Sequence, residues 1–119
     1  MTRLAAFALG ALLPLNALAA ELVMVEQDHC VWCARWDDEV GQAYPKTEEG
    51  RRAPLRRIDI AELPQAGLAL ERQASFTPTF ILIEDGAEVG RIEGYPGEHF
   101  FWPMLGQLLE RLDTAPGRS

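Results

Sequence analysis

The chain has 119 residues and carries 11 Lys and Arg side chains against 18 Asp and Glu side chains, so its formal net charge is −7 at pH 7. This length suits one small domain. The acidic balance, without a basic patch that has interleaved aromatic residues, argues against nucleic-acid binding.

The first segment has the composition of a secretory signal peptide. Arg3 gives it a charged start, an apolar run over 4–15 follows, and Ala17 and Ala19 form a small-residue cleavage site. The run is shorter than the ~20 apolar residues that span a bilayer, which argues against an uncleaved membrane anchor. We therefore expect cleavage after Ala19 or Ala20 and export, in a bacterium to the periplasm. The predicted division of the chain is a signal peptide over 1–20, a domain over 21–113 and a flexible tail over 114–119.

Hydrophobic periodicity predicts a strand and then a helix at the start of the mature chain. The apolar run that begins at Leu22 indicates a strand over 22–27. A helix is expected over 34–44, because apolar residues recur on one of its faces. Pro45 should end this helix, and the polar stretch 46–52 is expected to be a loop.

Three more strands and two more helices are expected further along the chain. The predicted strands cover 53–60, 76–83 and 88–93, and the predicted helices cover 62–73 and 97–112. The first two strands should be parallel because a helix connects them, and Asp85-Gly86 should join the last two as an antiparallel hairpin. Pro103 either kinks the last helix or marks a restart. The Arg51-Arg52 and Arg56-Arg57 pairs are interpreted as a solvated surface, with a docking patch for an acidic partner as the alternative.

The two cysteines of the chain, Cys30 and Cys33, lie at the junction between the first strand and the first helix. The unpaired N–H groups and the macrodipole at a helix N-terminus favour an anion, and the thiolate is the reactive form of cysteine. Cys33 lies one turn further, close enough to form a disulfide with Cys30. The pattern therefore indicates a redox-active pair, which an oxidising compartment would keep oxidised unless a partner reduced it.

Three other interpretations of the cysteines remain open. A purely structural disulfide would close a very short loop and so would restrict the unfolded chain little. A copper or zinc site could use Cys30, Cys33 and His99, although structural zinc usually takes four nitrogen or sulfur ligands. The third interpretation is a pair of inert buried thiols. For the protein as a whole, a separate alternative is a non-catalytic interaction domain that merely retains the cysteines.

The order βαβαββα, with Cys-x-x-Cys at the start of the first helix, resembles the thioredoxin fold. That resemblance implies a compact α/β architecture in which helices flank a central mixed four-stranded sheet. Thioredoxin-like proteins carry a cis-proline before the third strand, packed against the disulfide, and the segment Phe76-Thr77-Pro78-Thr79-Phe80 matches that motif. The resemblance therefore implies a cis Thr77–Pro78 bond. The alternative is an ordinary proline at the first position of a strand.

The short chain also resembles, more narrowly, the small periplasmic thioredoxin-like proteins of sulfur-oxidation gene clusters, the SoxS type. This resemblance implies a role in keeping the cysteine of a periplasmic sulfur-carrier protein usable. The chain departs from typical thioredoxins because it has no room for an extra strand and helix before the first strand. Met24 also stands where many thioredoxins have a buried acid. Glu26 could share the side of Met24, since side chains alternate along a strand, so either Glu26 or water could accept the proton of Cys33.

The predicted function is that of a thiol-disulfide oxidoreductase that reduces protein disulfides or mixed disulfides. Cys30 would attack as a thiolate, and Cys33 would resolve the mixed disulfide. No bound cofactor or metal is required, and a membrane electron carrier is expected to re-reduce the pair. Besides the two catalytic cysteines, the candidate substrate-binding residues are Trp32, Thr77 and Pro78, and the candidate modulators are Glu26, Asp28 and His29.

Overall fold

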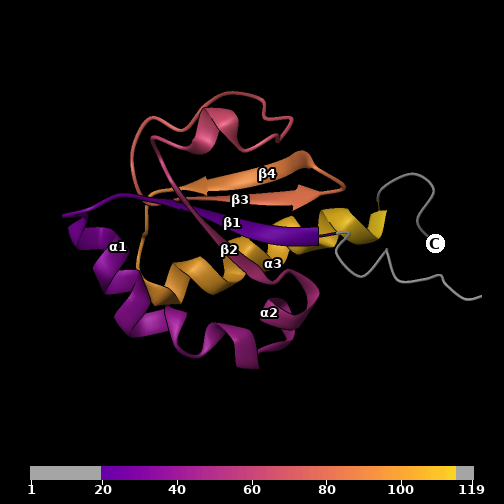
Figure 1. Cartoon of the computed structure of the whole chain (residues 1–119). Coiled ribbons are helices and arrows are strands. Elements are labelled where there is room, and N and C mark those ends of the chain that lie inside the picture. Colours follow the sequence, from indigo (N-terminus) through magenta and orange to yellow (C-terminus); the bar gives the residue numbers. More distant parts are fainter. Residues whose placement is uncertain (1–19, 115–119) are drawn as a thin grey trace, which may run out of the picture.

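A computed structural model gives the structure of the chain and describes residues 20–114 (Figure 1). The predicted signal peptide up to residue 19 and the tail beyond residue 114 lie outside the described residues. The strands are β1 (Ala20–Glu26), β2 (Leu55–Asp59), β3 (Thr79–Glu84) and β4 (Ala87–Glu93). The main helices are α1 (Val31–Trp36), α2 (Glu48–Arg52) and α3 (Glu98–Thr114). A π-helical segment, Asp37–Gly41, continues α1 directly.

The four strands form one mixed sheet in the order β2-β1-β3-β4. β1 and β2 are parallel, as expected of two strands joined by a helical crossover. β1 and β3 are antiparallel, and so are β3 and β4, with a tight turn at Asp85-Gly86. Both residues of this turn have a positive φ, 54° and 84°, which suits Asp-Gly in a hairpin. The predicted sheet and hairpin are therefore confirmed.

The sheet separates two apolar cores. Along β1 the side chains alternate, so that Leu22 and Met24 lie in the core beneath the helices, whereas Val23 and Val25 face the other side. Helices α1, α2 and α3 lie on the first side (Figure 1). The irregular segment between β2 and β3 covers the second side, where Leu63 and partly buried residues such as Leu68 pack against the sheet.

Four aromatic side chains fix α1 and α3 against the sheet. Trp36 at the end of α1 lies 5.2 Å from the ring of Phe80 on β3, and Phe80 packs edge to face on Phe101 of α3 at 5.0 Å. Tyr44 lies 6.2 Å from Trp36 and donates a 2.7 Å hydrogen bond to the carbonyl of Ala53. These ring contacts fix the position of the helix that starts at the cysteines relative to β3.

Two sequence expectations are wrong. Residues 46–52 contain helix α2 instead of a loop, because the Thr47 hydroxyl caps it by accepting from the Gly50 N–H at 3.0 Å. The helix expected over 62–73 is reduced to one 3₁₀ turn, Leu63–Gln65. Gly67 follows with a φ of 76°, which ends helical geometry, and the chain then runs irregularly over the second core.

The last helix, α3, runs through Pro103 as a single element, so the restart that we considered there is wrong. Pro103 is exposed and lies in the second turn. Within residues 20–114, no helix has the length and apolar character that crossing a membrane requires.

Candidate functional site

Cys30 lies at the start of α1 as its N-cap residue. Its backbone is extended, with φ −93° and ψ 103°, and its sulfur accepts a hydrogen bond from the Cys33 N–H at 3.1 Å. The two sulfurs form a disulfide, with 5.2 Å between the Cα atoms. Cys30 is partly exposed, whereas Cys33 is buried. The more exposed member of the pair is therefore Cys30, the cysteine expected to attack the substrate.

The segment before β3 brings a threonine hydroxyl to the disulfide, next to a cis-proline. The Thr77–Pro78 bond is cis, as the resemblance implied, and Pro78 is buried. The carbonyl of Pro78 accepts a 2.8 Å hydrogen bond from the Gly94 N–H, which ties the loop to the end of β4. The Thr77 hydroxyl donates to the Cys30 sulfur at 3.2 Å and accepts from Gln27 Nε2 at 2.9 Å. Thr77 thus contacts the disulfide, with Pro78 next to it in the chain, and Gln27 is a contact of Thr77 that the sequence did not reveal.

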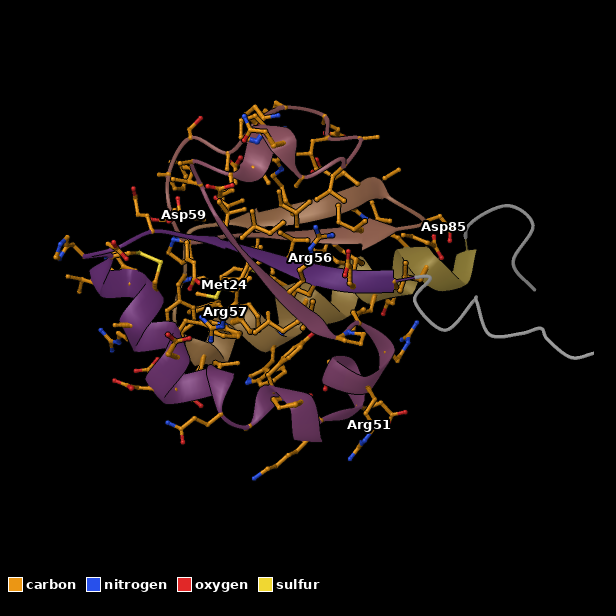
Figure 2. The ribbon with its side chains drawn as sticks, in the orientation of Figure 1. Met24, Arg51, Arg56, Arg57, Asp59 and Asp85 are labelled. Carbon is orange, nitrogen blue, oxygen red and sulfur yellow. A yellow bond between two sulfur atoms is a disulfide. The ribbon has the colours of Figure 1, made fainter. Side chains whose placement is uncertain are left out.

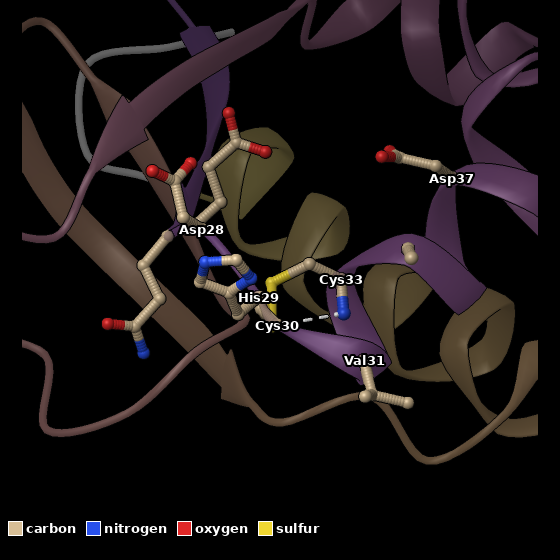
Figure 3. A pocket seen from close by; sticks show the side chains of 9 residues that line it. Asp28, His29, Cys30, Val31, Cys33 and Asp37 are labelled. Atoms are coloured by element: carbon tan, nitrogen blue, oxygen red, sulfur yellow. Dashed lines mark hydrogen bonds between the residues drawn. A yellow bond between two sulfur atoms is a disulfide. The ribbon is translucent and has the colours of Figure 1, made fainter.

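An open pocket of about 580 Å³ lies beside the disulfide (Figure 3). Asp28 and Asp37 lie on opposite sides of the cysteine pair in this view. The three candidate modulators, Glu26, Asp28 and His29, all line this pocket together with both cysteines. His29 has a φ of 62°, a left-handed conformation that non-glycine residues adopt infrequently. The complete lining is Glu26, Gln27, Asp28, His29, Cys30, Val31, Cys33, Ala34 and Asp37.

Arg57 on β2 joins two of the pocket carboxylates. It binds Glu26 at 2.8 Å and Asp37 at 2.7 Å, and its Nη1 lies 3.7 Å from the sulfur of Met24 (Figure 2). Burial disfavours the charge of Arg57, but hydrogen bonds and charge attraction from Asp37 and Glu26 outweigh it and raise its pKa. Glu26 does share the side of Met24. Arg57 is exposed on β2, as the interpretation of this stretch as a solvated surface expected, and its two ion pairs also fix the charges of Glu26 and Asp37 beside the cysteines.

Trp32 lies outside the pocket lining, on the exposed side of α1. Its side chain is 51% exposed, and the Arg35 guanidinium lies 5.6 Å from its ring centre. Arg35 in turn pairs with Glu39 at 2.9 Å. Val31 and Phe76, from the two segments that carry Cys30 and Pro78, are also exposed apolar side chains. Such a combination of an exposed sulfur and exposed apolar groups suits contact with another protein.

The arrangement can perform thiol-disulfide exchange. Cys30 is partly exposed, Cys33 is buried one helical turn away, and two hydrogen-bond donors face the Cys30 sulfur. Over residues 20–112, no group of three or more His, Cys, Asp or Glu side chains is placed to hold a metal ion.

The fold and the disulfide define a thioredoxin-like thiol-disulfide oxidoreductase. Among solved structures, the chain is 49% identical to the periplasmic thioredoxin SoxS from Paracoccus pantotrophus in its reduced form. The match covers 78% of this chain and 98% of that one, with a TM-score of 0.75. The chain belongs to the SoxS-type thioredoxins.

More distant thioredoxins share the fold alone. The thioredoxin of Fasciola hepatica is 23% identical, with a TM-score of 0.53, and that of Plasmodium falciparum is 16% identical, with a TM-score of 0.57. Each match covers 77% of this chain and 83% of the other. No protein-family model and no curated protein matches the chain.

Proposed function

We propose that this oxidoreductase reduces disulfides of exported proteins, with Cys30 as the attacking thiolate and Cys33 as the resolving thiol. The observation that carries the assignment is the asymmetry of the pair. Cys30 is a partly exposed residue whose sulfur receives hydrogen bonds from the Cys33 N–H and the Thr77 hydroxyl, whereas Cys33 is buried. Donors that face a sulfur stabilise its thiolate form.

The exchange proceeds in two balanced steps. The Cys30 thiolate attacks one sulfur of the substrate disulfide, a Cys30–substrate bond forms, and the other substrate sulfur leaves and takes up a proton. Cys33 then loses its proton and attacks the Cys30 sulfur, which releases the second substrate thiolate. Two electrons pass to the substrate, and Cys30 and Cys33 end as a disulfide. A membrane electron carrier would return the pair to its reduced state.

Glu26 is our candidate for the group that accepts the Cys33 proton. It lines the same pocket as Cys33, and no ionisable side chain occupies the position of Met24, where many thioredoxins have a buried acid. Arg57 holds the Glu26 carboxylate in place at 2.8 Å. Water in the open pocket would carry the proton between them. Asp28 and His29 would modulate the same step through their charge.

The substrate would be held by Trp32, Thr77 and Pro78, through apolar contact and by pairing of an extended segment with the Thr77 backbone. Because the solved relative is a SoxS thioredoxin, we assign as partner a sulfur-carrier protein with a cysteine to be freed. The periplasm is the proposed compartment, reached through cleavage of the signal peptide. Cleavage after Ala19 is favoured because Ala20 is buried and pairs with Glu84 in the sheet.

Trapping in the native compartment tests this function. Cys33→Ser should accumulate mixed disulfides through Cys30, since nothing remains to resolve them, and the trapped proteins should include the sulfur carrier. Cys30→Ser is the matched control and should trap few proteins or none. Equal trapping by both variants would contradict the assigned roles, and the absence of any sulfur carrier would contradict the assigned partner only.

A further inference from the structure

The Thr77 hydroxyl lies between a donor and the reactive sulfur. Gln27 Nε2 donates to Thr77 Oγ1 over 2.9 Å, and Thr77 Oγ1 donates to Cys30 Sγ over 3.2 Å. A threonine hydroxyl has one hydrogen to donate and two lone pairs. Because the Gln27 amide occupies a lone pair, the hydroxyl hydrogen is left to point at the sulfur.

Strand register explains why these two side chains meet. In the antiparallel β1–β3 ladder, Val25 is opposite Thr79. Continuing the same pairing by two residues beyond each strand places Gln27 opposite Thr77. A 2.8 Å hydrogen bond from the Thr79 hydroxyl to the Phe76 carbonyl holds the loop that presents Thr77. The contact between Gln27 and Thr77 is thus built into the sheet.

We propose that Gln27 is a positioning residue that keeps the Thr77 hydroxyl turned toward Cys30, so that the reduced sulfur has a second fixed donor besides the Cys33 N–H. The inference rests on the proposed role of Cys30 as the attacking thiolate. Reduction of the disulfide by a dithiol gives two thiols, the dithiol becomes a disulfide, and Cys30 then releases its proton to water. The resulting thiolate is the form that the two donors stabilise.

Several carboxylates lie around the Cys30 sulfur, so a neutral hydrogen-bond donor matters for the stability of its thiolate. From the end of β1 and the following turn, Glu26, Asp28 and His29 face the pocket that Cys30 lines, and Asp37 faces it from the helix. Arg57 of β2 is bound to Glu26 and Asp37. Carboxylates near a thiolate disfavour it, whereas hydrogen bonds to it favour it. The neutral pair Gln27 and Thr77 acts against this acidic surrounding without adding a charge that would bind Glu26 or Asp28.

Gln27→Glu tests the orientation directly. A glutamate of nearly the same shape can only accept from Thr77, so the hydroxyl hydrogen would turn away from Cys30. We expect the pKa of Cys30 to rise by about 1 or more, the size of one hydrogen bond to a charged group. The readouts are thiolate absorbance and the pH profile of Cys30 alkylation in the reduced protein. The redox potential should become more negative at the same time. Gln27 is exposed, so its replacement should not prevent folding.

A double-mutant cycle separates orientation from the added charge. In a Thr77→Val background no hydroxyl remains, so Gln27→Glu can act only through its charge. In the Thr77→Val background, the fold-change in the thiolate fraction of Cys30 that Gln27→Glu causes should therefore be at least threefold smaller than in the wild type. Thr77→Ser should keep the wild-type profile because it retains the hydroxyl. An equal effect of Gln27→Glu in both backgrounds would overturn the positioning role. Faster labelling of Cys33 than of Cys30 in the wild type would instead overturn the role of Cys30 itself.

Discussion

The Tyr95 hydroxyl donates a 2.5 Å hydrogen bond to the Glu39 carboxylate, which joins the end of β4 to the helix that begins at the cysteines. Glu39 also pairs with Arg35 at 2.9 Å, and Arg35 covers the ring of Trp32. Burial and the hydrogen bond to Glu39 raise the pKa of Tyr95 above its ordinary range. The exposed tryptophan beside Cys30 is therefore connected by three contacts to a buried tyrosine.

Tyr95→Phe should make the protein less stable at neutral pH, with an effect that fades in acid. The hydrogen bond from Tyr95, followed by that from Arg35, lowers the pKa of Glu39 in the folded protein. A carboxyl group with a lowered folded pKa stabilises the fold above its unfolded pKa, and this contribution is lost as the pH falls through the folded value. Urea unfolding at pH 7 and pH 3 should show a larger difference between variant and wild type at pH 7. An equal difference at both would show that the carboxylate is not involved.

Glu26→Gln should slow the resolution of the mixed disulfide about 100-fold at neutral pH, the range for loss of a general base. The first attack by Cys30 should hardly change, because that step does not need the Cys33 proton to move. Single-turnover kinetics measure the two steps separately: release of the first substrate thiol reports the attack by Cys30, and release of the second reports the resolution by Cys33. Asp37→Asn is the control, since it also removes one carboxylate partner of Arg57. Equal slowing in that variant would assign the effect to Arg57 and not to proton transfer.

Trp32→Ala should lower kcat/KM for a protein disulfide about tenfold, as expected when an exposed aromatic at the centre of an interface is removed. The side chain is half exposed and belongs to the same turn as Cys30, so a protein partner would cover it. A small aromatic disulfide, which is too short to reach the ring and the sulfur together, should react at nearly the wild-type rate. A parallel loss with both substrates would mean that Trp32 acts on the sulfurs and not on the partner.

The Cys30–Cys33 pair should have a redox potential of roughly −180 to −270 mV, between disulfide isomerases and thioredoxin. Glu26 and Asp28 line the pocket beside Cys30, and their negative charge limits the thiolate stabilisation that a strong oxidant needs. Equilibration with glutathione buffers, followed by tryptophan fluorescence, gives the value. A potential near −120 mV, typical of a strong oxidant, would make the protein a disulfide donor and would exclude the reductive direction.

Gly50→Ala should destabilise the protein by about 2–3 kcal/mol, the usual cost of forcing extra atoms into packed structure. A Cβ at Gly50 would overlap the carbonyl oxygen of Tyr44, and backbone cannot move aside as a flexible side chain can. Gly106→Ala in α3 is the control: nothing lies within 4 Å of its added Cβ. That substitution should stabilise the helix by about 0.5–1 kcal/mol. Denaturant midpoints compare the two, and a harmless Gly50→Ala would contradict the close packing of α2 on Tyr44.

Much of the fold could be predicted because the strands carry clear apolar runs. The run at the start of β1 and the Asp85-Gly86 turn led to the correct pairing of strands. The segment after β2 misled because Pro64 fits the first turn of a helix, whereas its apolar residues, such as Leu63 and Leu68, reach the sheet from an irregular backbone. The five residues of α2 are too few for periodicity to detect, and its signal was the cap at Thr47.

The sequence predicted the reactive residues of the site, but it did not predict the residues that contact them from distant parts of the chain. Cys30, Cys33 and Pro78 belong to short local motifs, so spacing was enough to select them. Gln27 and Arg57 act through partners 50 and 31 residues away, at Thr77 and Glu26. Such contacts depend on which residues lie opposite each other in the sheet, and a single sequence does not give that register.

The two faces of the sheet are covered differently, and we expect them to differ in local opening. On one face three helices pack on the strands, but on the other a segment with a single 3₁₀ turn protects Val23, Val25 and Ile81. That segment contains one short helical turn and no strand between β2 and β3, so we expect local opening there to need less free energy than global unfolding. Its amides should exchange with solvent deuterium well before those of β1 and β3, and the chain would be cut there first by proteases while the disulfide end stays closed.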